Sequence, residues 1–177
     1  VTPLSFITPN EPLVVSLASD LKNCDGLIIP GGESTTMTKL ILDNNLYETI
    51  NNFGLIKPVF GTCAGLILMS KNVDDYRVLS FNYLDIQIER NGWGRQKESF
   101  TKNIYINFNK NKIKFKATFI RAPKIIKYNK DIKILSELNN MPILIKYDKY
   151  LGSIFHPELV NDSRIHQYFI EMINGNK

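Results

Sequence analysis

The stretch PVFGTCAGLILMS, residues 58–70, decides the fold of this chain. Its apolar beginning predicts a short buried strand, and the apolar run 64–70 predicts a buried helix. Gly61 and Gly65 permit a sharp turn from the strand into the helix, which places Cys63 at the apex of the turn. Such an apex stands at the carboxyl end of a parallel sheet, where the active sites of α/β proteins collect.

A second strand, turn and helix come earlier, in GLIIPGGESTTM, residues 26–37. Residues 26–30 predict a buried strand, and residues 34–43 predict a helix, followed by another amphipathic segment that ends before Gly54. The inner faces of the two helical segments are expected to carry Met37, Leu40 and Ile41, and then Leu46, Ile50 and Phe53. This repeated order is typical of a parallel sheet with crossover helices.

The pattern changes from residue 84 onward, where apolar and polar residues alternate with period two. This alternation predicts antiparallel strands at 84–89, 103–108 and 112–120, and a hairpin of 141–147 with 150–155 around Asp148 and Lys149. A last helix is expected to be capped near Asp162 or Ser163 and to end at Gly175. Its predicted buried face consists of Ile165, Phe169, Met172 and Ile173.

These elements predict a single α/β domain over residues 1–177. We expect a three-layer flavodoxin-like or Rossmann-like mixed sheet, with a mostly parallel core flanked by helices and with added antiparallel strands. The length of 177 residues and the 44% of apolar residues fit one globular domain with a real core.

Composition excludes several classes of function. No apolar run reaches the roughly 18–20 residues of a membrane span, and no signal peptide is visible at Val1. The net charge of +5 comes from scattered lysines. The alternating lysines of residues 110–116 favour a solvated strand face over a nucleic-acid groove. Only two cysteines are present, which favours a reducing cytoplasm over a disulfide framework. Because there is no CxxC motif and the two histidines lack a matching ligand set, we expect no metal site.

Three residues form a candidate catalytic triad. Cys63 is expected at a helix N-terminus, where the thiolate is favoured, although a buried structural cysteine is the alternative. His156 follows the apolar run 151–155 and so lies at a predicted strand end. Glu158 is placed to orient the imidazole, as the third member of a nucleophile–base–acid triad does. Cys24 is interpreted as structural, and His166 is expected on the exposed side of the last helix.

Other residues are candidates for substrate binding. The turn at Gly31 and Gly32 offers backbone N–H groups to an anion or an oxyanion, whereas the alternative is a simple turn with a helix cap at Ser34. A mononucleotide P-loop is excluded because GxxxxGK[ST] is absent. Arg90 and Arg121 each follow a predicted strand, which suggests a carboxylate clamp, with plain surface charge as the alternative.

Together these segments resemble one known family, the glutaminase subunit of pyridoxal 5′-phosphate synthase, within the triad-type (class I) glutamine amidotransferases. The resemblance covers about residues 21–172. The strings that carry it are LIIPGGESTT (27–36), GTCAG (61–65), ERN (89–91), GRQ (94–96) with SF (99–100), FIRAP (119–123) and FHPEL (155–159).

The resemblance implies hydrolysis of L-glutamine to L-glutamate and ammonia through a glutamyl thioester. Cys63 would be the nucleophile, His156 the base and then the acid, and Glu158 the orienting carboxylate. The family's glutamine contacts fall on Gly31, Gly32, Glu33, Arg90, Ile120 and Arg121, and its oxyanion hole falls on the backbone N–H groups of Gly32 and Ala64.

The resemblance also implies a partner. Ammonia would pass to a (β/α)8 synthase subunit that makes pyridoxal 5′-phosphate, in an assembly of twelve copies of each subunit. The glutaminase would be nearly idle until docked, and would need no metal or organic cofactor of its own.

Residues 1–20 depart from the family pattern, because they lack its opening strand ending in Leu-Gln-Gly and its Glu-His helix. We therefore expect a glutaminase domain without the family's usual first strand. Two alternatives follow: an impaired, truncated or diverged copy that only binds the synthase, or a glutaminase that serves another synthase. A Cys–His peptidase is disfavoured, because a dedicated amide clamp suits a small substrate better.

Overall fold

The computed structural model describes residues 4–7, 12–15, 18–90, 92, 99–109 and 111–175. Its first half contains β1 (Leu4–Ile7), β2 (Pro12–Val15), η1 (Ala18–Asn23), β3 (Gly26–Ile29), α1 (Ser34–Asp43), α2 (Tyr47–Ile56), β4 (Val59–Thr62), α3 (Ala64–Met69), β5 (Ser70–Val73) and β6 (Leu84–Glu89). Its second half contains β7 (Ser99–Phe108), β8 (Asn111–Ile120), β9 (Lys124–Tyr128), β10 (Lys133–Leu138), β11 (Met141–Tyr147), β12 (Tyr150–Ser153), η2 (Pro157–Leu159) and α4 (Arg164–Gly175).

A mixed sheet runs through the centre of the molecule in the strand order β10-β11-β12-β4-β3-β1-β2. Its middle strands β3, β4 and β12 are parallel, with Ile28 opposite Phe60 and Leu151 opposite Phe60 on the other side. Every residue of these three strands is buried. The prediction of a parallel core is therefore confirmed, and the carboxyl ends of the three strands meet at one edge.

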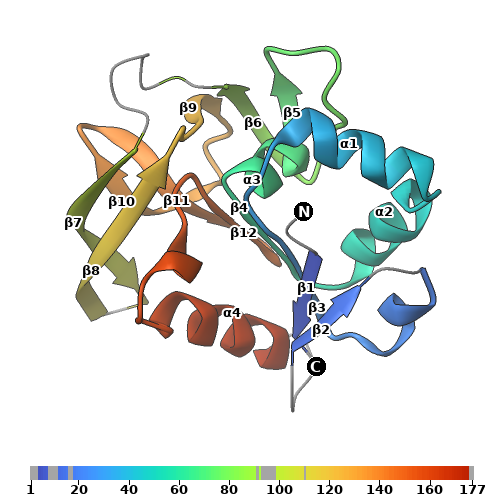
Figure 1. Ribbon diagram of the computed structural model, residues 1–177. Helices are drawn as coiled ribbons and strands as arrows, with labels where there is room; N and C mark the ends of the chain where they lie inside the picture. Colours follow the sequence, from blue (N-terminus) through green and yellow to red (C-terminus); the bar gives the residue numbers. More distant parts are fainter. Residues whose placement is uncertain are drawn as a thin grey trace.

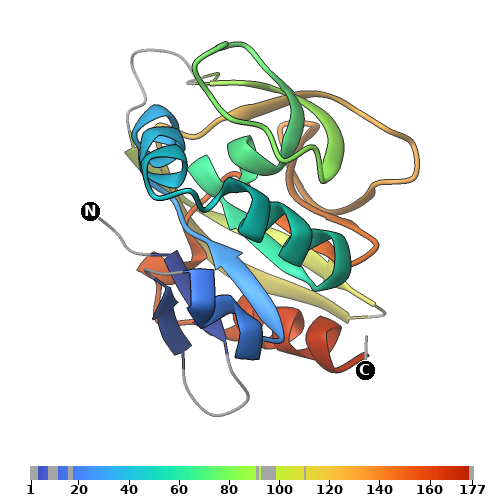
Figure 2. The ribbon, with the colours of Figure 1, turned by 90° about the vertical axis from the view of Figure 1, so that its right-hand side faces the viewer.

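Helices cover both faces of this sheet, which gives the expected three layers. Helices α1, α2 and α3 lie on one face and α4 lies on the other (Figures 1 and 2). Side chains of β4 alternate accordingly: Phe60 packs against Phe169 of α4, whereas a Cβ on Gly61 would meet Met69 of α3. Among the described helices, none is long and apolar enough to cross a bilayer.

The predicted antiparallel additions are also present. Strands β5, β6 and β9 form a smaller mixed sheet, in which β6 is antiparallel to β9 as predicted but parallel to β5, and β7 and β8 form a long antiparallel ribbon. This ribbon packs against the α4 layer, where Phe108 stacks on Tyr168 with ring centroids 4.2 Å apart. Lys112, Lys114 and Lys116 are exposed on β8 while Phe115 and Phe119 are buried, as the alternation predicts; Lys110 lies outside the described residues.

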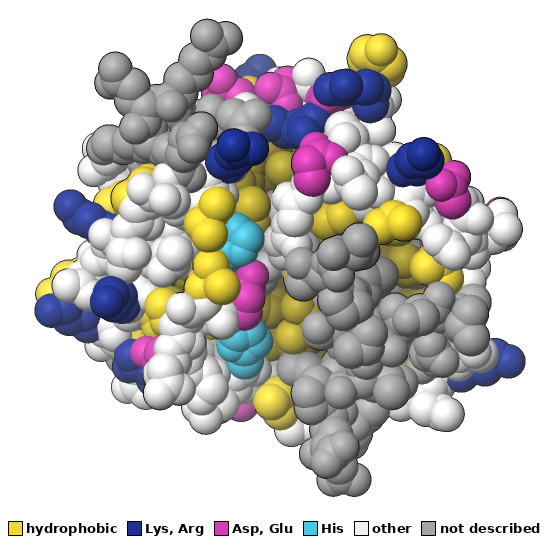
Figure 3. Space-filling model, in the orientation of Figure 1, with side chains coloured by type: hydrophobic (Ala, Val, Ile, Leu, Met, Phe, Trp, Pro, Cys, Tyr) yellow, Lys and Arg dark blue, Asp and Glu magenta, His cyan; other side chains and the backbone are white. Residues whose placement is uncertain are grey.

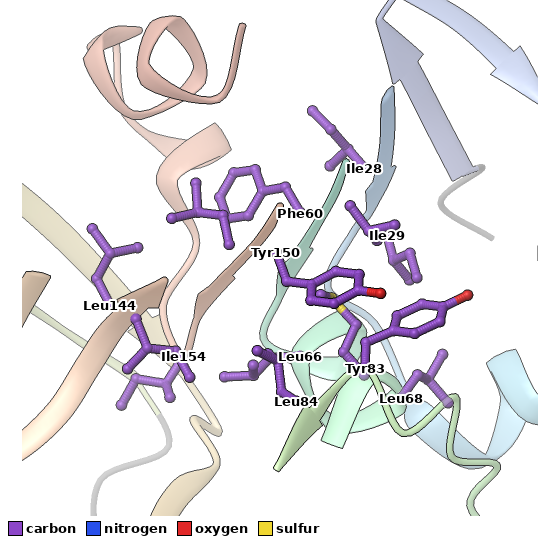
Figure 4. Close-up of a cluster of buried hydrophobic side chains, with 14 of the residues drawn as sticks. Ile28, Ile29, Phe60, Leu66, Leu68, Tyr83, Leu84, Leu144, Tyr150 and Ile154 are labelled. Atoms are coloured by element: carbon purple, nitrogen blue, oxygen red, sulfur yellow. The ribbon is translucent and has the colours of Figure 1, made fainter. Parts of the chain in front are cut away.

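The hydrophobic core joins these layers around β4 and β12. Figure 4 shows the rings of Tyr83 and Tyr150 side by side with Leu66 and Leu84 near them, whereas Phe60 points toward the α4 side of the sheet. The two tyrosine rings stack with centroids 5.1 Å apart, and their hydroxyls donate to the carbonyls of α2 residues Ile50 and Gly54, at 2.8 and 3.0 Å. Burial with satisfied hydroxyl groups is what fixes aromatic side chains in one arrangement.

Two predicted helix faces are confirmed only in part. Helix α1 buries Ser34, Thr38 and Ile41, while Leu40 is 40% exposed. The cause is polar, because the Thr38 hydroxyl accepts the backbone N–H of Leu79 at 3.0 Å and so turns that side inward. Helix α4 buries Tyr168 fully and Met172 only in part, since the β7–β8 ribbon covers Tyr168.

Several strands were not predicted from the sequence. Strands β1 and β2 extend the main sheet beyond β3, and both of their pairings are antiparallel. Strand β10 forms the opposite edge against β11, and β9 pairs with β6. Strands β2, β9 and β10 lie at sheet edges. Strands β1 and β2 have four residues each, and β9 and β10 mix exposed and buried side chains without a clean alternation, so period alone gives a weak signal.

Candidate active site

Cys63 occupies a strained turn between β4 and α3. Its backbone has φ 49° and ψ −105°, a left-handed conformation that non-glycine residues adopt at a cost. The turn is tight because α3 passes directly over β3: a Cβ on Gly65 would lie 1.9 Å from the carbonyl oxygen of Ile29. The predicted cysteine elbow is therefore present, and packing of the core holds it in shape.

The thiol of Cys63 lies among strand ends. Its backbone N–H donates to the carbonyl of Ser153 at the end of β12, at 2.7 Å. Its Sγ lies 3.8 Å from the carbonyl oxygen of Ile120, at the end of β8. The side chain is only 6% exposed. Ile120, one of the predicted glutamine contacts, is thus a direct neighbour of the sulfur.

His156 follows β12 and its backbone N–H donates to the carbonyl of Thr118 in β8, at 2.8 Å. Its ring Nδ1 lies 2.8 Å from Oε1 of Glu158, which sits in the 3-10 turn η2. The ring also rests on the backbone of Gly31, where a Cβ would come within 2.2 Å of its Cε1. The structure therefore brings the Gly31–Gly32 turn and the histidine together.

The electrostatics of His156 favour the imidazolium. Burial alone would lower the pKa of His156, but hydrogen bonds to Cys63 and Glu158 outweigh it and raise this pKa to about 10. Glu158 holds one ring nitrogen, and Cys63 is close enough to act on the charge of the imidazole. A positive charge between a sulfur and a carboxylate is the arrangement expected of a thiolate–imidazolium pair.

His166 is not on the exposed side of α4, so that prediction is wrong. Its ring is half-buried and meets the ring of Phe60 edge-on, with centroids 6.1 Å apart. Figure 3 shows the two histidines of the chain on one face with an acidic side chain between them. Burial lowers the pKa of His166, although the negative charge of Glu158 acts in the opposite direction.

The predicted substrate residues Glu33 and Arg90 contact each other. Nη2 of Arg90 lies 2.8 Å from Oε1 of Glu33. The other oxygen of Glu33 accepts from the hydroxyl of Thr35 and from the N–H of Thr36, at 2.5 and 2.7 Å. Burial acts to raise the pKa of Glu33, but these hydrogen bonds lower it to about 2. Glu33, rather than Ser34, is therefore the side chain that caps α1.

The other predicted site residues lie at the same strand ends. Gly32 follows β3, and Ala64 begins α3, whose first N–H groups have no partner within a helix. Arg121 directly follows Ile120 at the end of β8 in a left-handed conformation, φ 42°. Cys24 is buried in the core beside η1. The motif residues Asn91, Gly94, Arg95 and Gln96 lie outside the described residues.

Sequence reasoning missed the residues that hold the site through their backbones. The carbonyl of Thr118 accepts the backbone N–H of His156, and the carbonyl of Ser153 accepts that of Cys63. Backbone roles of this kind do not depend on the side chain, so no sequence pattern predicts them. Sequence reasoning also missed Asp75, whose carboxylate contacts Arg90. The only available signal was an Asp-Tyr-Arg triplet at residues 75–77, and such a polar triplet by itself predicts only an exposed loop.

A strained cysteine beside a histidine–carboxylate pair, at the carboxyl end of a parallel sheet, defines a cysteine-nucleophile enzyme of the α/β class. Comparison with known proteins narrows this class. The SNO glutamine amidotransferase family matches residues 7–175. This chain belongs to that family.

Relatives and a solved structure agree with this membership. The chain is 46% identical over 167 residues to the pyridoxal 5′-phosphate synthase subunit PdxT of Thermotoga sp. (strain RQ2), covering 92% of this chain and 87% of the relative. It is 46% identical over 157 residues to the protein of the same name from Thermoplasma acidophilum, covering 88% and 75%. A crystal structure of a glutamine amidotransferase matches with TM-score 0.84 at 34% identity, covering 90% of this chain and 85% of that one.

Proposed function

We propose that this chain is the glutaminase subunit of a pyridoxal 5′-phosphate synthase and that it hydrolyses L-glutamine to L-glutamate and ammonia. One observation carries the proposal: a cysteine on a strained elbow lies beside a histidine whose Nδ1 is 2.8 Å from a carboxylate. Membership of a glutamine amidotransferase family supports the choice of glutamine as the amide.

The first half of the reaction is acylation of Cys63. The thiolate attacks the carbon of the side-chain carboxamide, and the carbonyl oxygen takes up the negative charge. Backbone N–H groups of Gly32 and Ala64 would bind this oxyanion, at about 3 kcal/mol per donor. His156 then gives its proton to the leaving nitrogen, so that ammonia departs and a glutamyl thioester remains.

The second half is hydrolysis of the thioester. His156, now neutral, accepts a proton from water, and the resulting hydroxide attacks the thioester carbon. Collapse of that intermediate releases glutamate and regenerates the thiolate. Glu158 keeps the imidazole in one orientation through both steps and stabilises its charged form, which is the role of the third triad member.

The polar ends of glutamine need charged partners. Glu33 pairs with Arg90, Gly31 lies against the ring of His156, and the carbonyl oxygen of Ile120, the residue before Arg121, lies 3.8 Å from the thiol. We assign the α-carboxylate of glutamine to the arginines and its α-ammonium group to Glu33, because charged hydrogen bonds of this kind give both affinity and orientation.

The partner in this proposal is the synthase subunit, with the two chains assembled as twelve copies of each in the cytoplasm. Support comes from the relatives, which are named as subunits of a pyridoxal 5′-phosphate synthase. Ammonia would pass directly to the synthase, which would keep it from being protonated and lost in solvent.

Ammonia release in the complex tests the proposal. With glutamine and the synthase subunit from the same source, we expect steady glutaminase turnover that the synthase strongly stimulates. Cys63→Ala should reduce turnover by about 10,000-fold or more, because the nucleophile is lost. Cys24→Ala is the matched control and should leave the rate unchanged.

Three results would contradict the proposal. Glutaminase turnover that persists in Cys63→Ala would show that Cys63 is not the nucleophile. Stimulation only by a different synthase would change the partner. An inactive wild-type chain that still binds the synthase would identify a copy that only docks.

A further inference from the structure

Four charged side chains form a continuous row beside the proposed glutamine site, in the order Arg77, Asp75, Arg90 and Glu33. Asp75 lies between the two arginines in the connection from β5 to β6. Its Oδ1 accepts from Nε of Arg77 at 2.9 Å, and its Oδ2 accepts from Nη2 of Arg77 at 2.7 Å and also from Nη1 of Arg90. Arg90 reaches Glu33 with its other terminal nitrogen.

Asp75 is held far more firmly than an ordinary loop carboxylate. Its side chain is only 13% exposed, and the backbone N–H of Arg77 also donates to it, at 3.0 Å. Hydrogen bonds from Arg77, followed by the charges of both arginines, hold the pKa of Asp75 far below its usual range. The neighbouring Asp74 accepts the backbone N–H of Arg90 at 3.0 Å, so the same loop fixes Arg90 at its backbone and at its tip.

This arrangement sets the orientation of the Arg90 guanidinium. Its two terminal nitrogens point to two different carboxylates, Asp75 and Glu33. Without Asp75, Arg90 would be free to turn both nitrogens onto Glu33, because arginine and carboxylate favour a parallel two-bond pair. Such a pair would occupy the two groups that glutamine needs.

We propose that Asp75 is a positioning residue for glutamine binding: it holds one terminal nitrogen of Arg90, so that Arg90 makes a single contact with Glu33 and both groups keep hydrogen-bonding capacity for the substrate. This inference rests on the proposed function. Within the described part of the chain, the hydrogen bonds of Asp75 go to arginines and not to Cys63, His156 or Glu158. Its loss should therefore weaken substrate binding and leave the chemical step intact.

Steady-state kinetics of the complex with the synthase test this separation. Asp75→Asn should raise KM for glutamine about tenfold, the size expected for a lost charged hydrogen bond, while kcat stays within about twofold. Asp75→Glu should recover part of the loss. The matched control is Asp85→Asn, which removes a carboxylate that pairs with Lys71 at 3.0 Å near the start of β6, and it should change neither constant.

Labelling of Cys63 supplies a second readout. The glutamine analogue 6-diazo-5-oxo-L-norleucine should label Asp75→Asn about tenfold more slowly than the wild type at low concentration. Iodoacetamide carries no amino-acid group, so it should label Cys63 of the wild type and of Asp75→Asn at the same rate.

The outcomes separate the two proposals. If the analogue fails to label Cys63 of the wild type, the proposed function fails. If it labels the wild type and Asp75→Asn equally, the positioning role alone is overturned. Equal slowing of both reagents, a fall in kcat with unchanged KM, or loss of cooperative unfolding in Asp75→Asn would assign Asp75 to general structure and overturn it too.

Discussion

The elbow at Cys63 and the charged row at Arg90 lie at the same edge of the molecule, but they are built differently. The elbow is fixed by backbone contact, with Gly65 against Ile29 and the N–H of Cys63 bound to Ser153. The charged row is fixed by side chains from separate elements, and its Glu33 end is half exposed. The nucleophile therefore depends on the core, whereas substrate recognition depends on ion pairs.

This difference divides the expected effects of mutation. Changes beneath the elbow should alter folding and chemistry together, because a packed backbone has no second arrangement to adopt. Changes in the charged row should alter affinity for glutamine alone, because partly exposed ion pairs contribute little to folding. The predictions below test that division, beginning with the largest effect.

Gly65→Ala should damage the elbow most. The added Cβ would lie 1.9 Å from the carbonyl oxygen of Ile29, so α3 must move away from β3. We expect a loss of about 3 kcal/mol or more in the free energy of unfolding, measured by urea denaturation, together with loss of glutaminase activity.

The control for this substitution is Gly175→Ala at the end of α4, where a Cβ would have no neighbour within 4 Å. It should change the free energy of unfolding by less than about 0.5 kcal/mol. A Gly65→Ala chain as stable and active as the wild type would show that the elbow does not depend on this contact.

Glu158→Gln should act on the chemistry without disturbing the core. It removes the carboxylate that lies 2.8 Å from Nδ1 of His156, so the imidazole loses both charge stabilisation and orientation. We expect kcat to fall about 100-fold, with KM for glutamine nearly unchanged. An effect on KM alone would place Glu158 with the substrate-binding groups instead.

The same variant has a signature in pH. NMR should show His156 of the wild type holding its proton up to about pH 10, while His166 titrates below the ordinary value for histidine. Because the pKa of His156 is raised in the folded state, its contribution to stability is full below about pH 6.5 and is lost as the pH rises through about 10. Glu158→Gln should lower that pKa and shrink this contribution.

The smallest of these effects belongs to the charged row, where Asp75→Asn should raise KM with little change in kcat or in stability. A large loss of stability there would erase the contrast between the two regions. The contrast would be established if Asp75→Asn changes only KM while Glu158→Gln changes only kcat.

Much of the elbow could be predicted from sequence because its causes are local. A short apolar run, two glycines around a cysteine and an apolar helix specify β4, the turn and α3 without distant information. His156 and Glu158 were predictable as well, since a strand end precedes them and their spacing of two residues fits a hydrogen bond. The parallel order of β3, β4 and β12 then brings them to Cys63.

The rest depends on contacts between distant segments. Asp75 reaches Arg90 only because β5 lies beside β6, and Tyr168 is buried only because the β7–β8 ribbon covers it. His166 is another example. The helical period predicts an exposed side chain, but the ring packs against Phe60 of a distant strand. Strands β1 and β2 have four residues each, which is too short for a clear periodic signal.

Mapping the covalent adduct of the glutamine analogue tests the central claim most directly. The chain in complex with its synthase is treated with 6-diazo-5-oxo-L-norleucine, digested and sequenced by mass spectrometry. We predict one adduct, on Cys63, that an excess of glutamine prevents and that His156→Asn slows strongly. An adduct on Cys24 in place of Cys63, or labelling of Cys63 that neither glutamine nor His156→Asn affects, would contradict the account.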